Sequence, residues 1–79
     1  MKVRVNLYGT LRQRFPAYRP SEGIEVDLPE GATVRDLLSL LDIPESQRAV
    51  VVVESRILKA EDKLQRGVPV NVLQAMGGG

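Results

Sequence analysis

The chain has 79 residues, enough for one small domain, and its 11 basic and 10 acidic residues leave a formal charge of +1. The absence of cysteine and histidine excludes disulfides, thiolate or imidazole metal ligands, and cysteine or Ser-His nucleophiles, so we expect no metal site. The charge balance gives no case for nucleic acid, the longest apolar run (residues 49–53) is too short to span a membrane, and no signal peptide is apparent, so we expect a cytoplasmic protein.

The first elements are a strand and a short helix. Residues 2–8 alternate between apolar and polar side chains, which predicts a strand with one buried face. Gly9 ends the alternation. The spacing of Thr10 and Gln13 is that of a capping box, which predicts a short helix that Pro16 terminates.

The next elements are a second strand and the main helix. Residues 24–28 alternate again and predict a strand, followed by a turn at residues 29–31. Thr33 and Asp36 have the spacing of a helix cap, and an apolar stripe follows at helical intervals. The stripe consists of Val34, Leu37, Leu38 and Leu41. A helix this short is marginal alone, so its stripe must pack against a sheet.

The last third of the chain predicts three more strands. The continuous run 49–53 suits an interior strand covered on both faces, or nearly so. A turn at residues 54–56 and a short returning strand at 57–58 follow. Residues 59–67 predict a loop fixed by Leu64 and closed at Gly67. The final strand covers residues 68–73, with Pro69 among its first residues, where no hydrogen-bond donor is needed.

This order of elements predicts an α+β fold of the β-grasp, or ubiquitin-like, type. One main helix covers a mixed sheet of four to five strands, because the long connection after the second strand carries the helix. We expect residues 1–74 to form the domain and residues 75–79 to form a flexible C-terminal glycine tail.

The tail ends in Gly77, Gly78 and Gly79. Glycine has no Cβ, so such a segment can enter channels that are closed to other residues, and a terminal glycine offers an unhindered carboxylate. Two interpretations of the tail remain open at this point. The terminal carboxylate is the working group of the protein, or the glycines are a frayed end or a cloning remnant.

Four segments of the chain resemble the ubiquitin-like sulfur-carrier proteins (MoaD/ThiS-like), which include the small subunit of molybdopterin synthase and the thiamine-pathway sulfur carrier. They are Leu7–Arg12, Leu28–Leu38, the spaced residues Leu64, Gly67 and Val70, and the terminal Gly78-Gly79. The chain departs from the family's Asp-Gly-Asp turn, where it has Arg66-Gly67-Val68, and from its Asn-Gly hairpin, where it has Glu54-Ser55-Arg56.

The two branches of the family are not separated by these residues. The first helix and the overall length resemble the molybdopterin branch. Residues 73–76 look more like the thiamine branch, because the Pro-Pro pair of the molybdopterin branch is missing before the glycines.

The resemblance implies a function for the terminus. A partner uses ATP to adenylate the carboxylate of Gly79, and a sulfur nucleophile then converts it to a thiocarboxylate that donates sulfur in cofactor biosynthesis. Gly77 and Gly78 would give the terminus reach, and Met76, Leu73 and Phe15 could form an apolar docking patch. Core packing is the alternative role for Phe15 and Leu73.

The resemblance also implies partners, namely an E1-like adenylating enzyme (MoeB/ThiF-like) and either the large subunit of molybdopterin synthase or thiazole synthase. The chain itself would bind no cofactor, since ATP is used by the activating partner, and it would not be catalytic alone. A molybdopterin synthase small subunit is the first hypothesis, and a thiamine-pathway carrier is the second. A ubiquitin-like modifier that forms isopeptides with lysine and an interaction module with inert glycines are the other two.

Overall fold

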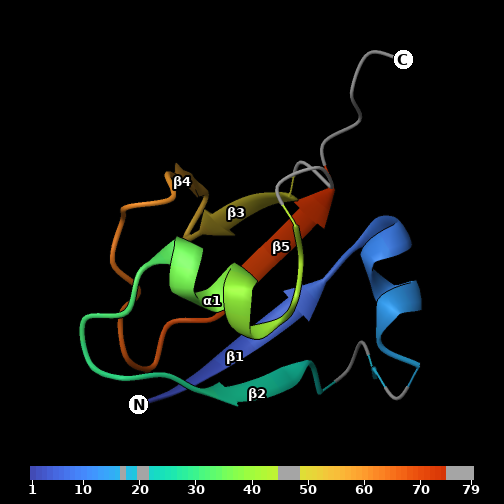
Figure 1. The fold of residues 1–79 in the computed structure, drawn as a ribbon, viewed down its shortest axis with the longest axis horizontal. Coiled ribbons are helices and arrows are strands. Elements are labelled where there is room, and N and C mark those ends of the chain that lie inside the picture. Colours follow the sequence, from blue (N-terminus) through green and yellow to red (C-terminus); the bar gives the residue numbers. More distant parts are fainter. Residues whose placement is uncertain (17, 20–21, 45–48, 75–79) are drawn as a thin grey trace.

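The computed structural model describes residues 1–16, 18–19, 22–44 and 49–74, without the side chains of Thr10 and Arg14. Five strands form one mixed sheet in the order β2-β1-β5-β3-β4 (Figure 1). The elements in chain order are β1 (Lys2–Leu7), the 3₁₀ helix η1 (Gly9–Arg14), β2 (Ile24–Asp27), α1 (Val34–Leu40), β3 (Ala49–Val53), β4 (Arg56–Leu58) and β5 (Val70–Gln74). The predicted β-grasp fold is confirmed.

The strand pairing places the last strand in the middle of the sheet. β5 runs parallel to β1 on one side and antiparallel to β3 on the other, and all remaining pairs are antiparallel. The helix α1 crosses one face of this sheet (Figure 1). The core between them is made of apolar side chains, and among the described residues no polar or charged side chain is buried. Leu7, Leu11, Leu37, Val5 and Val72 are the most deeply buried.

The main helix begins as its cap residues predict. The Asp36 backbone N–H donates to Thr33 Oγ1 at 3.3 Å, and the Thr33 backbone N–H donates to Asp36 Oδ2 at 3.0 Å. This reciprocal capping box satisfies two backbone donors that the first helical turn leaves without partners. Val34 and Leu37 are buried, as the predicted stripe requires.

The first helix has a different start from the one its sequence predicts. η1 is a 3₁₀ helix whose N-cap is Tyr8, and no side chain caps it. Thr10 therefore lies inside the helix, and the predicted capping box from Thr10 to Gln13 is wrong. Leu11 enters the core, while Phe15 is half-buried and packs against it.

The interior strand β3, expected to be covered on both faces or nearly so, is covered by α1 on one face and is partly exposed on the other. Val51 is 2% exposed and points toward α1, whereas Val50 and Val52 on the opposite face are half-exposed. Successive side chains of a strand point to opposite faces, and α1 covers only one of them.

The chain between β4 and β5 is held by one apolar anchor. Leu64 is buried, and its backbone N–H donates to the Ala32 carbonyl at 2.8 Å. Gly67 follows with a φ of 77°, as its predicted place at the end of the loop suggests. The strand begins at Val70 and not at Val68, so Pro69 lies outside the hydrogen-bonded ladder.

Candidate functional site

The base of the C-terminal segment is fixed on both sides by the sheet. Val70 and Val72 of β5 are 1% and 0% exposed, and they pair with Val5 and Leu7 of β1. On the other side, the pairing with β3 extends to Gln74, which lies opposite Ala49. Gln74 is the last described residue, so the sheet holds the chain up to that point.

The parallel pairing of β1 and β5 decides where the C-terminal segment leaves the domain. Parallel strands end at the same edge of a sheet, so η1, which follows β1, lies beside the end of β5 (Figure 1). The Tyr8 backbone N–H donates to the Val72 carbonyl at 3.1 Å and ties the two strand ends together. The Tyr18 hydroxyl accepts from the Leu7 backbone N–H at 2.9 Å and ties the following loop to the same edge.

The face of the sheet opposite α1 is named here the open face. One part of it carries the aliphatic side chains of β3, β4 and β5, which we name the open-face patch. The patch consists of Val50, Val52, Ile57 and Leu73. Ile57 is 74% exposed and Leu73 is 36% exposed. Leu73 lies directly opposite Val50 in the register, so the patch extends almost to the end of β5.

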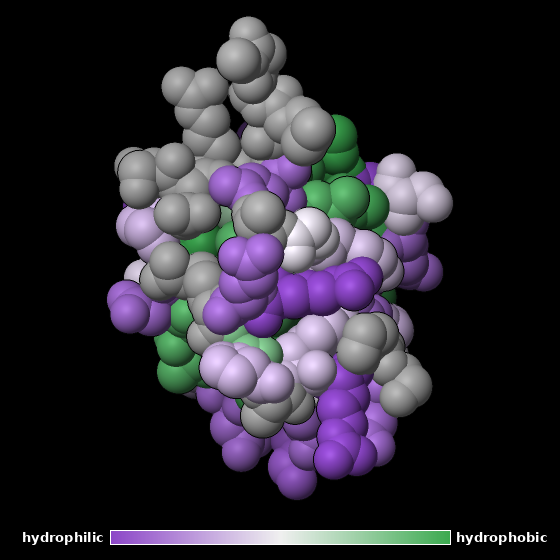
Figure 2. All heavy atoms as spheres, turned by 90° about the vertical axis from the view of Figure 1, so that its right-hand side faces the viewer, coloured by the Kyte–Doolittle hydropathy of each residue, from purple (hydrophilic) through white to green (hydrophobic). Residues whose placement is uncertain are grey.

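The surface beside the ends of β1 and β5 carries both hydrophilic and hydrophobic side chains. Figure 2 shows hydrophilic atoms across the middle of this side of the molecule, with hydrophobic atoms gathered at the upper right and at the left. On the open face, β1 and β2 contribute charged side chains, including Lys2 and Glu25, whose Nζ and Oε1 atoms are 3.6 Å apart. Both side chains are about two-thirds exposed, so this ion pair contributes little to stability.

A hydrogen-bonded cluster separates the aliphatic and the charged parts of the open face. Asn6 of β1 and Asn71 of β5 are register partners, and Asn6 Nδ2 donates to Asn71 Oδ1 at 3.2 Å. The Tyr8 hydroxyl donates to the same oxygen at 3.2 Å. Asn71 Nδ2 donates to the Val52 carbonyl at 3.5 Å, a long contact. We name these three side chains, Asn6, Tyr8 and Asn71, the polar seam.

The predicted site residues are placed only in part. Gly77, Gly78, Gly79 and Met76 lie outside the described residues. Leu73 lies on the open face next to the end of β5, where a partner of the terminus could reach it. Phe15 is half-buried against the core, which is the packing role considered as its alternative.

Sequence reasoning missed the polar seam and most of the open-face patch. In residues 49–53 every side chain is apolar, so no alternation marks which ones face outward. Val50 and Val52 could have been found from the number of helices, because a single main helix can cover only one face of the sheet.

Among the described residues, no group of acidic side chains has the arrangement of a metal site, and no helix is both long and apolar enough to cross a membrane.

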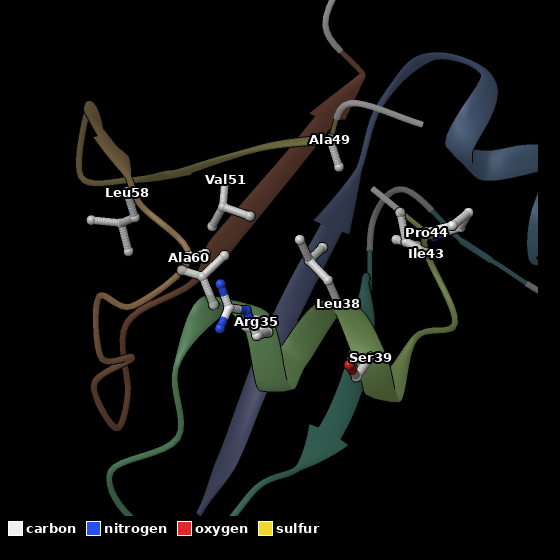
Figure 3. Close-up of a pocket in the computed structure, with 10 residues that line it drawn as sticks. Arg35, Leu38, Ser39, Ile43, Pro44, Ala49, Val51, Leu58 and Ala60 are labelled. Carbon is white, nitrogen blue, oxygen red and sulfur yellow. The ribbon is translucent and has the colours of Figure 1, made fainter. Parts of the chain in front are cut away.

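A separate cavity of about 450 Å³ lies on the other face of the sheet, between α1 and the β3–β4 hairpin. Figure 3 shows Leu38 of α1 and Val51 of β3 on its walls, with Leu58 farther along the sheet. Arg35 lies at its rim, where its Nη2 is 2.9 Å from Glu61 Oε1. The cavity faces α1 and is not part of the surface around the end of β5.

Comparison with known proteins identifies the family. A family model described as the ThiS family matches residues 5–79. The chain belongs to the ThiS family. This membership confirms the resemblance to the ubiquitin-like sulfur carriers, and it implies partnership with an E1-like enzyme and the large subunit of a synthase. No match was found among curated protein sequences.

Solved structures agree with the ThiS-family fold. A protein from Pyrococcus furiosus assigned as molybdopterin converting factor, subunit 1, is 26% identical, with a TM-score of 0.71 over 94% of this chain and 97% of its own. Haloferax volcanii SAMP1 is 16% identical, with a TM-score of 0.73 over the whole of both chains. A second structure of H. volcanii small archaeal modifier protein 1 is also 16% identical, with a TM-score of 0.72 over 92% of this chain and 95% of that one. At 16% identity, these two support the fold alone.

Proposed function

We propose that this ThiS-family chain is a sulfur carrier whose reactive group is the carboxylate of Gly79. One observation carries the proposal: the family match extends through the terminal glycines to residue 79. The fixed strand β5, which precedes them at the centre of the sheet, supports it further.

The proposed chemistry has two steps. The carboxylate attacks the α-phosphate of ATP on a partner enzyme, which gives an acyl-adenylate and releases pyrophosphate. A hydrosulfide ion then attacks the acyl carbon, AMP leaves with the electrons of the broken acyl–oxygen bond, and loss of a proton gives a C-terminal thiocarboxylate. The chain needs no reactive side chain for either step, in keeping with its lack of cysteine and histidine. It binds no cofactor of its own, because ATP belongs to the activating enzyme.

The fold supplies the position of the reacting group. Five residues, of which the last three are glycines, separate the strand β5 from the carboxylate, which can enter a partner's active site while the domain docks outside it. The open-face patch is the docking surface in this proposal, because Leu73 joins it directly to the end of β5. Met76 would extend the apolar contact along the tail.

For the pathway, we propose molybdenum cofactor biosynthesis in the cytoplasm, with the chain as the small subunit of a molybdopterin synthase. The P. furiosus molybdopterin converting factor subunit supports this choice, since it is the most similar in sequence of the three structures described. Its partners would be an E1-like adenylating enzyme and the large subunit of the synthase. A thiamine-pathway carrier, whose acceptor would be thiazole synthase, is the alternative within the same chemistry.

A protein modifier is a second candidate function. It is favoured by the fold shared with two structures of a small archaeal modifier protein. In that case the acyl-adenylate would be captured by lysine amines on other proteins, giving isopeptides in place of a thiocarboxylate.

One experiment separates the sulfur carrier from the protein modifier. The chain is incubated with a purified E1-like enzyme of the source organism, ATP and a sulfide donor, and its intact mass is measured. We expect the mass increase of one oxygen replaced by sulfur, and we expect it to disappear when Gly78 and Gly79 are deleted. Isopeptide products on lysines, without the thiocarboxylate, would favour the modifier. Neither product, with an enzyme that is active on another carrier, would refute both candidates.

A further inference from the structure

We propose that the polar seam (Asn6, Tyr8 and Asn71) determines which activating enzyme can dock on the open face, by requiring an oxygen acceptor on the enzyme. The inference rests on the proposed function, because it concerns the surface through which the carrier meets its E1-like partner. It adds a hydrogen-bond requirement to a contact that is otherwise apolar.

The seam lies where a docked partner must cover it. Asn71 is two residues from Leu73 on the same face of β5, and its register partner on β3 is Val52, which belongs to the open-face patch. Tyr8 is 40% exposed and lies at the edge of the sheet from which the C-terminal segment leaves. A partner that contacts Leu73 and reaches the terminus therefore desolvates Asn71 and Tyr8.

The hydrogen bonds within the polar seam use its acceptor but leave N–H donors of Asn6 and Asn71 unused. Asn71 Oδ1 accepts from both Asn6 Nδ2 and the Tyr8 hydroxyl, so its two lone pairs are used. Each carboxamide nitrogen has two hydrogens, and the contacts within the described part of the chain use one of each. A covering surface without an acceptor would leave these N–H groups unsatisfied, and unsatisfied buried donors are costly.

The chemistry of the partner follows from this count. The enzyme should present aliphatic side chains to the open-face patch, and one carboxylate or carboxamide oxygen opposite Asn71. An apolar surface lacking that oxygen would be rejected, in the way that sites built around a hydrogen bond reject an analogue that cannot make it. The seam would thus separate the cognate enzyme from other apolar surfaces.

The test is the substitution Asn71→Leu, which keeps the size of the side chain and removes its polar atoms. If docking were purely apolar, leucine would add to the patch and the KM for the carrier would stay equal or fall. Under our proposal the KM rises about tenfold or more while kcat stays within about twofold, because an acceptor on the enzyme loses its donor. The assay is ATP–pyrophosphate exchange by the purified E1-like enzyme of the source organism at varied carrier concentration.

Two further variants keep the test decisive. Asn71→Asp keeps an oxygen that accepts from Asn6 and Tyr8 but has no N–H group for an acceptor on the enzyme, so it should also raise the KM about tenfold or more, and it replaces Asn71→Leu if that variant does not fold. Leu40→Ala, on α1 and far from the open face, should leave the KM unchanged. Normal exchange by the wild type with unchanged KM values in both seam variants would overturn the seam alone. No exchange by the wild type would overturn the proposed function and the inference with it.

Discussion

Ile57 is the residue whose truncation should separate docking from folding most clearly. It is 74% exposed on the three-residue strand β4, so most of its surface contributes nothing to the stability of the free domain. Full burial of such a side chain is worth about 1.5–3 kcal/mol, and three-quarters of that amount, about 1–2 kcal/mol, remains available to a partner. Ile57→Ala should therefore raise the KM for the carrier about 5- to 30-fold.

The exposed fractions also predict an order of effects. Leu73 is 36% exposed, so a partner can gain only about 0.5–1 kcal/mol from it, and Leu73→Ala should raise the KM about two- to sixfold. Leu40 is 53% exposed but lies on α1, at the other face of the sheet, so Leu40→Ala should leave the KM for the carrier unchanged. The matched comparison of Ile57 with Leu40 controls for the general effect of removing an exposed aliphatic side chain.

Pyrophosphate exchange at varied carrier concentration gives the KM, and thermal unfolding shows whether the variants remain folded. We expect Ile57→Ala to shift the thermal midpoint very little. The reasoning would be refuted if Leu40→Ala raised the KM as much as Ile57→Ala did, or if Ile57→Ala left the KM unchanged. Either result would place the docking surface away from the open face.

Three further substitutions test the fold that carries this surface. Thr33→Ala removes half of the capping box and should lower the stability by about 1 kcal/mol, seen as a thermal midpoint about 4–8 °C lower. Ser55→Gly relieves a residue with a φ of 66° and should raise the stability by about 0.5–1 kcal/mol in urea unfolding, because the relief exceeds the added entropy of the unfolded chain. Gly23→Ala should destabilise by more than about 1 kcal/mol in the same assay, since φ is 69° and a Cβ would lie 2.8 Å from both Asn6 Oδ1 and the Val5 carbonyl oxygen.

The parts of the fold that could be predicted are those fixed by local chemistry. The Thr33–Asp36 cap, the alternation in residues 2–8 and the burial of Leu64 each depend on neighbours in sequence or on a single partner surface, and all three occur in the structure. The predicted start of η1 is wrong, because two residues with the spacing of a capping box often occur where no helix is capped. The helix, in which Leu11 packs into the core, has its N-cap at Tyr8, two residues earlier than the Thr10 signal suggested.

The candidate docking site was harder to predict, because it depends on which face of the sheet is left uncovered by the helix. Val50, Val51 and Val52 are the same residue type, yet only Val51 is buried, and the difference arises from the position of α1. The pairing of Asn6 with Asn71 joins residues 65 positions apart and requires the parallel register of β1 and β5. No local pattern contains that register. The role of the terminal glycines rests on the resemblance and stays a prediction.

In the proposed function, the central place of β5 gives the terminal carboxylate a firmly held base. A strand at an edge of the sheet could separate locally, exposing one row of hydrogen bonds. β5 has a neighbour on each side, and its buried residues Val70 and Val72 pack in the core, so its release would break two ladders and expose the core at once. Local opening at the base therefore costs more than the release of an edge strand would. In the proposed function, the reach of the terminal carboxylate would therefore come from the residues after the strand, and glycine, which has no Cβ, suits that role.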